Sequence, residues 1–110
     1  MANLCSPESL EKFVNILRNN KISLISSEGC GACVEAKKLL NKNNYIYKVI
    51  NIDKEEHEDM FYCIYDVTKS HYVPQVFINN RFVGGYKELL YLNTTGLLKD
   101  LYDIDKKQNI

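Results

Sequence analysis

The sequence carries no net charge and no long apolar run. Its 14 basic and 14 acidic side chains balance over 110 residues, so no overall field favours nucleic acid or an anionic membrane as a partner. No apolar stretch approaches the roughly 20 residues that span a bilayer, and the opening residues lack the basic-then-apolar order of a secretion signal. Repeats, low-complexity tracts and linker-like stretches are also missing. We therefore expect one domain over residues 1–110, in the cytoplasm, with no nucleic-acid and no membrane partner.

Cysteine is sparse and unevenly spaced. The chain has four cysteines: Cys5, Cys30, Cys33 and Cys63. Small secreted domains carry a denser disulfide lattice, so this usage indicates a reducing compartment. A zinc site usually adds a second Cys-x-x-Cys or a paired histidine at fixed spacing, whereas His57 and His71 lie singly. The pattern therefore predicts no metal site.

The apolar pattern alternates between helical and extended periods. In chain order it predicts a helix started by Ser6-Pro7, a strand over 22–25, a helix over 34–41, a strand over 45–52, a helix capped by Asp53, a hairpin with strands 76–78 and 81–83, and a last helix over 97–102. A parallel strand–helix–strand unit followed by an antiparallel hairpin makes a mixed sheet covered by helices.

The same periods identify side chains expected in the core. Two helices carry an apolar stripe: Leu10, Phe13, Val14 and Leu17 on the first, and Met60, Cys63, Ile64 and Val67 on the one after Asp53. Cys63 is therefore expected to be a buried core thiol, and Cys5, near a terminus, to be oxidised only incidentally. His57 stands in the charged run 54–59, where a solvated helix residue is expected.

Cys30-Gly-Ala-Cys33 is the most informative motif, because it lies between an expected strand and an expected helix. The first sulfur of such a pair sits at the positive end of the helix dipole, which stabilises its thiolate. The second sulfur lies one turn along, close enough to displace a partner from the first, so the pair suits thiol–disulfide exchange. Gly29 and Gly31 let another backbone approach Cys30 closely, which a structural bridge or a pair of buried thiols does not need.

With this motif placed, the chain resembles a glutaredoxin, a member of the thioredoxin-fold superfamily. The resemblance covers roughly residues 8–104 and rests on three segments: Cys30-Gly-Ala-Cys33, Tyr72-Val73-Pro74-Gln75 with the strand that follows, and Phe82-Val-Gly84-Gly85-Tyr86. It implies a thioredoxin-like three-layer α/β fold, with a four-stranded mixed sheet flanked by helices. It also implies a dithiol oxidoreductase in which Cys30 is the catalytic nucleophile and Cys33 resolves the mixed disulfide.

The resemblance further implies a cis peptide bond between Val73 and Pro74. A cis X-Pro bond lies only about 0.5–1 kcal/mol above trans, so a fold can fix it in a tight turn. Cis geometry leaves the Val73 amide and carbonyl directed outward beside the thiol, where a peptide-like ligand can pair as a short extra strand. The alternative is an ordinary trans proline that starts an edge strand.

In glutaredoxins the ligand is glutathione, which implies these contact residues here: Tyr72, Val73, Pro74, Gly84, Gly85, Tyr86, Lys87 and Glu88. Val73 pairs with the cysteine portion of glutathione, and the γ-glutamyl end lies by the Gly-Gly turn, where free amides of a helix start bind a carboxylate. Lys87 stands where many members have aspartate, and Glu88 is the candidate to hold the γ-glutamyl ammonium instead. The alternative for these side chains is an ordinary solvated helix start.

Three departures from the family pattern stand out. Ser27 replaces a lysine that many members carry, His71 replaces an arginine or lysine, and Gly31-Ala32 replaces Pro-Tyr. The first two changes weaken the cationic reception of the glycyl carboxylate of glutathione, and they remove positive charge that stabilises a Cys30 thiolate. His71 is expected to be a surface loop residue.

The remaining charges near the motif are mixed in sign. Glu28 adds to the loss of positive charge if it points inward. Lys37 and Lys38 follow Cys33 within two turns and are candidates to compensate, although a solvated helix face is their simpler role.

The sequence therefore predicts a glutathione-dependent thiol–disulfide oxidoreductase that reduces disulfide-bonded and glutathionylated proteins. Glutathione is the expected reductant, no metal or other cofactor is required, and the chain is expected to be a monomer. Two alternatives stay open. The missing cations favour a thioredoxin-like reductase served by a flavoprotein, and the loss of the proline between the cysteines favours an iron–sulfur carrier that bridges a cluster between two subunits through Cys30.

Overall fold

The computed structural model describes residues 4–104. Its elements, in chain order, are α1 (Pro7–Asn19), β1 (Ile22–Ser26), α2 (Gly31–Lys42), β2 (Lys48–Asn51), the 3₁₀ turn η1 (Glu55–His57), α3 (Met60–Thr68), β3 (Gln75–Ile78), β4 (Arg81–Gly84), α4 (Tyr86–Thr95) and α5 (Leu97–Tyr102). Within this range no helix combines the length and the apolar character that a membrane span requires.

The sheet is mixed, with strand order β2–β1–β3–β4. β1 pairs in parallel with β2, where Leu24 lies opposite Val49, and antiparallel with β3, where Ile25 lies opposite Gln75. β4 pairs with β3 as the second strand of a hairpin. The two inner strands, β1 and β3, are buried at every position, as expected for strands covered on both faces. The predicted parallel unit followed by an antiparallel hairpin is confirmed.

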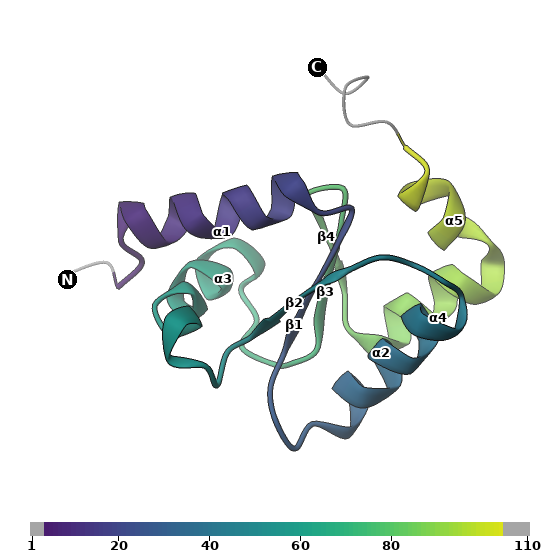
Figure 1. The fold of residues 1–110 in the computed structure, drawn as a ribbon, viewed down its shortest axis with the longest axis horizontal. Coiled ribbons are helices and arrows are strands. Elements are labelled where there is room, and N and C mark those ends of the chain that lie inside the picture. The colour runs from purple at the N-terminus through teal and green to yellow at the C-terminus, as the bar shows by residue number, and fades with distance from the viewer. Residues whose placement is uncertain (1–3, 105–110) are drawn as a thin grey trace.

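Helices cover both faces of the sheet (Figure 1). α1 and α3 lie against one face and contact each other, while α2, α4 and α5 lie against the other. Each face has its own apolar core. The α1/α3 side is built around Phe13, Ile25, Ile50, Met60 and Phe77. The opposite side is built around Leu24, Leu40, Val76, Leu89 and Leu98. The predicted three-layer arrangement of a four-stranded mixed sheet flanked by helices is confirmed.

α1 begins where its sequence signal predicts. The Ser6 hydroxyl accepts a hydrogen bond of 3.1 Å from the Ser9 amide and so caps the helix, and a proline occupies the first turn. Phe13 and Leu17 are buried, but Leu10 is 40% exposed. The buried face is centred on Ser9, Phe13 and Leu17, and Leu10 lies at its edge.

The strand expected over 45–52 is shorter, because backbone groups at its start are used elsewhere. β2 covers only Lys48–Asn51 of that range. The Tyr45 amide donates to the Leu40 carbonyl at 3.0 Å, and the Ile46 amide donates to the Tyr102 hydroxyl at 3.4 Å. The Tyr45 and Tyr102 rings meet edge to face at 4.9 Å. These contacts hold residues 45–46, which follow α2, against α2 and α5 and keep them out of the sheet.

The expectation that Asp53 caps a helix is wrong. η1 is a short 3₁₀ turn, and α3 begins only after it. The carboxylate of Asp53 instead accepts a hydrogen bond from the backbone amide of Glu28, in the loop before α2. The expected buried stripe of α3 is confirmed except for Val67, which lies in the last turn and is 53% exposed.

The turn residues between β3 and β4 and the last helix over 97–102, which is α5, are confirmed, while α4 is a separate helix that precedes it. Asn79 and Asn80 both take positive φ, 48° and 74°, and connect β3 to β4. α4 and α5 are two separate helices, divided at Gly96 with φ of 84°. The Gly96 amide donates to the Asn93 carbonyl at 3.3 Å, which ends α4 in the left-handed conformation that glycine favours.

A disulfide joins Cys5 to Cys63, so the expectations of a free core thiol at Cys63 and of incidental oxidation at Cys5 are wrong. The two Cα atoms are 4.8 Å apart, although 58 residues separate them in sequence. Both cysteines are buried in the core between α1 and α3, at 9% and 0% exposure. The cross-link therefore fastens the segment ahead of α1 to α3.

We expect reduction of the Cys5–Cys63 bond to lower the free energy of unfolding. Closing a loop of 58 residues restricts the unfolded chain, an effect of about 4 kcal/mol in the chain-entropy account and commonly about 2–4 kcal/mol in practice. Urea unfolding of a Cys30→Ser/Cys33→Ser variant, with and without a dithiol reductant, measures it. Adding Cys5→Ala/Cys63→Ala to that variant is the control, because its stability should not respond to the reductant. Equal midpoints for the oxidised and reduced forms would contradict the expectation.

Candidate active site

Cys30 and Cys33 form a disulfide at the start of α2, with their Cα atoms 5.2 Å apart. Cys30 is the N-cap residue of the helix, and its Sγ accepts a hydrogen bond of 3.1 Å from the Cys33 amide. Cys33 is 1% exposed, whereas Cys30 is half-buried and reaches the surface. The structure thus gives the pair one accessible and one shielded sulfur.

This position favours the thiolate of Cys30 once the pair is reduced. The amides of a first helical turn have no partner inside the helix, and the helix dipole is positive at this end. One of those amides already points at the Cys30 sulfur. Attack on a disulfide requires a sulfur that is both negative and accessible, and within the pair Cys30 meets both conditions.

A shallow hollow lies beside the disulfide, between the β1–α2 loop, the start of α2 and the end of β2. Ser27, Glu28, Lys37 and Asn51 line it together with the two cysteines. Lys38 instead faces solvent and pairs with Glu35 at 3.5 Å. Of the two lysines considered as compensating cations, only Lys37 therefore lies beside Cys30, and Glu28 shares that hollow.

A longer groove of about 870 Å³ opens on the other side of the motif. It is lined by every residue expected to contact glutathione, namely Tyr72, Val73, Pro74, Gly84, Gly85, Tyr86, Lys87 and Glu88. Ala32, between the two cysteines, lines it as well. The start of β3, the end of β4 and the start of α4 meet here, so the fold brings the predicted residues together next to the cysteine pair.

Val73 joins this groove to the cysteine pair. Its carbonyl oxygen lies 3.8 Å from Cys30 Sγ, and the Val73–Pro74 bond is cis, as expected. Within residues 4–104 the Val73 amide has no protein hydrogen-bond partner. An available amide and carbonyl beside the reactive sulfur make a docking point for an extended peptide backbone.

At the far end of the groove, the Gly-Gly turn holds Glu88 in place. Glu88 Oε1 accepts a hydrogen bond of 2.7 Å from the Gly85 amide and caps α4. A Cβ at Gly85 would come within 3.2 Å of the Pro74 carbonyl oxygen, and a Cβ at Gly84, whose φ is 124°, would lie 2.6 Å from Glu88 Cγ. Glycine at both positions therefore permits a turn that fixes a carboxylate at this end of the groove.

The loop before Val73 is fixed by polar side chains that were not among the predicted site residues. Gln75 is 3% exposed, and its Nε2 donates to the carbonyls of Ser70 and Tyr72 at 2.8 and 2.9 Å. The Ser70 amide donates to the Thr68 hydroxyl at 3.1 Å. A polar residue directly after Pro74, in a strand otherwise apolar, is the sequence signal for this role.

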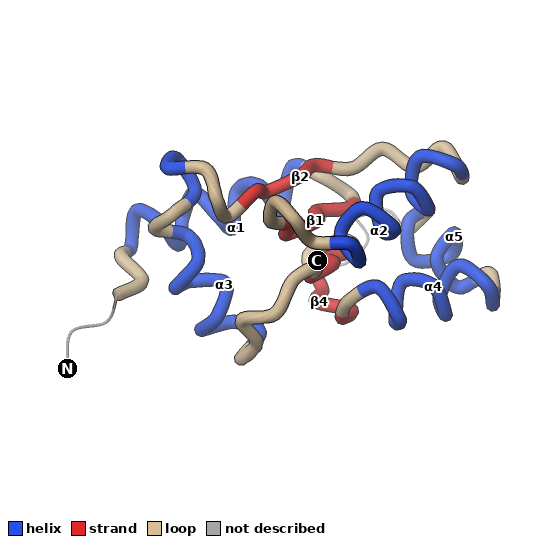
Figure 2. Tube along the Cα trace, turned by 90° about the horizontal axis from the view of Figure 1, so that it is seen from below, coloured by secondary structure: helices blue, strands red, loops and turns tan. Residues whose placement is uncertain are grey.

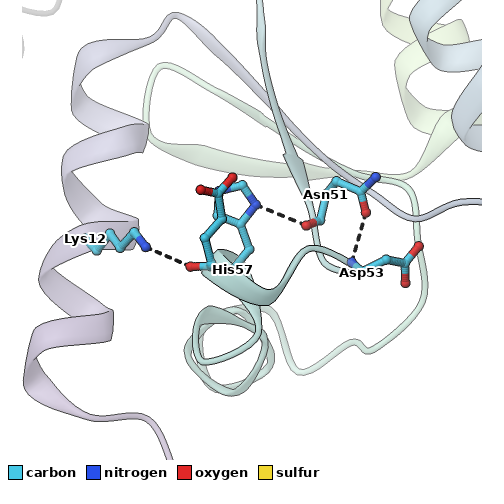
Figure 3. A network of polar contacts seen from close by, with 5 residues as sticks. Lys12, Asn51, Asp53 and His57 are labelled. Carbon is cyan, nitrogen blue, oxygen red and sulfur yellow. Dashed lines mark hydrogen bonds and ion pairs between the residues drawn. The ribbon is translucent and has the colours of Figure 1, made fainter.

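A second polar network starts at α1 and reaches the end of β2 (Figure 3). Lys12 Nζ donates to the Glu56 carbonyl at 2.7 Å, and His57 Nδ1 lies 3.0 Å from the Asn51 carbonyl. The His57 side chain is only 12% exposed. The expectation of a solvated helix residue at His57 is therefore wrong, because the ring packs into the β2–α3 connection.

The same network continues to the loop that precedes the cysteine pair. Asn51 Oδ1 accepts a hydrogen bond of 2.9 Å from the Asp53 amide. The Asp53 carboxylate then accepts the Glu28 amide, close to Cys30 in sequence. Asn51 and Asp53 were not among the predicted site residues, yet they position the loop from which Cys30 projects.

His71 lies exposed on the surface, as expected, and it lines neither the hollow nor the groove. Its ring stacks on Tyr72, with centroids 4.8 Å apart. Within residues 4–104, no group of three or more histidine, cysteine, aspartate or glutamate side chains is placed to hold a metal ion.

We expect Cys30 to be the most reactive thiol of the reduced protein. It is the accessible sulfur at the helix start, whereas Cys33 is 1% exposed. Competitive alkylation near neutral pH, read by peptide mass spectrometry, should label Cys30 before Cys33. Cys5 and Cys63 should stay unlabelled while their disulfide is intact, which provides an internal control. Faster labelling of Cys33 would show that the nucleophile is assigned wrongly.

Comparison with solved structures identifies the fold. The crystal structure of a buckwheat glutaredoxin–glutathione complex superposes with a TM-score of 0.80 at 24% identity, over 86% of this chain and 87% of that chain. The solution structure of a dithiolic glutaredoxin from Trypanosoma brucei brucei gives a TM-score of 0.76 at 33% identity, over 83% and 95% of the two chains. The chain therefore has the thioredoxin-like α/β fold.

Comparison of sequences identifies the family. The glutaredoxin family model matches residues 13–83. The mitochondrial glutaredoxin-2 of Rattus norvegicus is 33% identical over 86 residues, which are 77% of this chain and 55% of that protein, so the chain spans about half the length of this relative. Glutaredoxin-2 of Schizosaccharomyces pombe is 34% identical over 83 residues, 74% of this chain and 76% of that protein. The chain belongs to the glutaredoxin family, in its dithiol form with Cys30 and Cys33 as the active-site pair.

Proposed function

We propose that this chain is a glutathione-dependent thiol–disulfide oxidoreductase that reduces glutathione mixed disulfides and protein disulfides. The observation that carries the proposal is the distance of 3.8 Å between Cys30 Sγ and the Val73 carbonyl oxygen. It puts an accessible sulfur at the mouth of a groove that offers free backbone groups to an extended peptide. Membership of the glutaredoxin family supports the same activity.

In the first proposed reaction, the Cys30 thiolate attacks the glutathione sulfur of a glutathionylated protein. The protein thiolate leaves and takes up a proton, and Cys30 now carries the glutathione in a mixed disulfide. The thiolate of a second glutathione attacks the sulfur of the bound glutathione. Oxidised glutathione leaves, and the Cys30 thiolate is restored at the N-terminus of α2.

In the second proposed reaction, Cys30 attacks an intramolecular disulfide of a substrate protein. One substrate sulfur leaves as a thiolate and takes up a proton, and the other stays bonded to Cys30. Cys33, after losing its proton, attacks Cys30 and releases the second substrate thiol. The product is the Cys30–Cys33 disulfide seen in the structure. Two glutathione molecules then reduce this disulfide and leave as oxidised glutathione.

The groove is proposed to hold glutathione along its length. Val73 would pair with the cysteine portion through its amide and carbonyl, and Tyr72 and Pro74 would border it. The Gly84-Gly85 turn, with Tyr86, would receive the γ-glutamyl end. Lys87 and Glu88 give this end both signs of charge, which suits a group that carries an ammonium and a carboxylate. A glutathione complex of a buckwheat member with the same fold supports this use of the groove.

The remaining features of the proposal concern the whole molecule. We propose that the chain acts as one glutaredoxin-like domain over residues 1–110, as a cytoplasmic monomer, without a metal or organic cofactor besides glutathione. A reduction assay with glutathione and glutathione reductase, run beside one with thioredoxin reductase, distinguishes it from a thioredoxin-like reductase. A brown colour after anaerobic purification would point to the iron–sulfur carrier instead.

We expect the two active-site cysteines to differ in their requirement. Cys33→Ser should keep deglutathionylation, because that reaction uses one protein sulfur, and should lose reduction of intramolecular disulfides. Cys30→Ser should lose both. One glutathionylated protein and one disulfide-bonded protein, assayed with each variant, provide the measurement. Equal loss of both activities in Cys33→Ser would contradict the single-thiol route and favour the thioredoxin-like alternative.

We expect Ser27→Lys to raise glutathione-dependent turnover. Ser27 lines the hollow beside Cys30, where a cation would meet the glycyl carboxylate and favour the thiolate. One exposed ion pair contributes about 0.2–1 kcal/mol, so the gain in kcat/KM should be no more than about fivefold. Ser27→Gln is the matched control, because it adds a long side chain without charge. An equal gain in both variants, or none in either, would show that charge at this position is not used.

A further inference from the structure

Three exposed rings lie one beside the next near the active site: the His71 ring stacks on Tyr72, and the Tyr65 ring meets His71 at a tilt of 37°. The His71 ring lies 4.8 Å from the Tyr72 ring, nearly parallel at 26°, and 6.1 Å from the Tyr65 ring. Tyr72 is 75% exposed and Tyr65 is 43% exposed. These residues, hereafter the ring stack, come from α3 and from the loop that joins α3 to β3 (Figure 2).

The ring stack is held by rigid parts of the fold. Tyr65 projects from α3, and buried Gln75 binds the carbonyls of Ser70 and Tyr72 on either side of His71. The Tyr72 amide donates to the Ser70 hydroxyl at 3.3 Å. The exposed parts of these rings do not pack in the core and are available for contact with a partner. Because the rings are already ordered, little conformational entropy is lost when a partner binds.

The ring stack also adjoins the point where a polypeptide joined to Cys30 can pair with the Val73 backbone. A substrate bonded to Cys30 Sγ lies within reach of the Val73 backbone, because the sulfur and the Val73 carbonyl are 3.8 Å apart. Tyr72 is the next residue along that edge and lines the groove. A chain that pairs with Val73 therefore extends over Tyr72 and His71, and its alternate side chains meet the rings.

We propose that the ring stack is a docking surface for polypeptide substrates, which contacts an aromatic or large apolar side chain next to the substrate cysteine. A contact between two aromatic rings stabilises a complex by more than the burial of their apolar area alone. The neighbouring exposed charges, Asp66 and Lys69, have opposite signs, and the chain carries no net charge, so charge does not select the partner. This inference rests on the proposed function, because the substrate reaches the surface through the sulfur exchange at Cys30.

The experiment compares two peptides that each contain one intramolecular disulfide, because such a peptide becomes bonded to Cys30 itself. They differ only beside their cysteines, one with phenylalanine on both sides and one with serine. The wild-type protein should prefer the phenylalanine peptide in kcat/KM, and Tyr65→Ser should reduce this preference by about three- to tenfold. Tyr65→Phe should retain it. Tyr62→Ser is the matched control, because Tyr62 is on the same helix, is 41% exposed, and lies outside the ring stack.

The mixed disulfide of glutathione with 2-mercaptoethanol separates this inference from the proposed function. Its turnover should be unchanged in Tyr65→Ser, which does not line the groove. If the wild-type protein turns over no glutathione mixed disulfide, the proposed function fails. If it turns over the mixed disulfide but does not distinguish the two peptides, or if Tyr62→Ser and Tyr65→Ser behave alike, the docking surface is wrong. A dimer in solution that Tyr65→Ser dissociates would also overturn it, because a second copy would then cover the rings.

Discussion

The antiparallel pairing of β1 with β3 is the constraint on which the site depends. Ile25, near the end of β1, lies opposite Gln75, the first residue of β3. The chain leaving β1 therefore reaches the same sheet edge as the chain entering β3. The first carries Cys30 and the second carries Val73, which is why two segments far apart in sequence come within 3.8 Å. Parallel pairing with β2 adds Asn51 to that edge.

The parts of this site that the sequence predicted are those encoded by neighbouring residues. A cysteine pair between a strand and a helix, a proline before a strand and two glycines before a helix each act through local backbone geometry. The parts it did not predict are tertiary. Asp53 carries the usual signal of a helix cap, yet its carboxylate accepts the Glu28 amide instead. Nothing near either cysteine reveals the Cys5–Cys63 bond, since its two ends are 58 residues apart.

Backbone groups supply positive potential at the nucleophile, where the sequence has Ser27 and His71 rather than lysine or arginine. Lys37 and Glu28 both line the hollow beside Cys30, and their opposite charges offset each other there. The amide of Cys33 and the dipole of α2 remain as fixed, oriented sources of positive potential. Such groups need no side-chain ordering to act, so their effect on the sulfur is built into the helix itself.

The two disulfides, Cys30–Cys33 and Cys5–Cys63, differ in their access to solvent and therefore in their chemistry. One bond sits at the surface end of α2, and the other lies between two helices in the core. Each takes up an electron pair on reduction, but only the surface bond meets a reductant without an opening of the core. A redox titration of the whole chain therefore sums a catalytic couple with an architectural one. The Cys30–Cys33 couple reports exchange with thiols in solution. The Cys5–Cys63 couple reports how much the folded core stabilises its own disulfide.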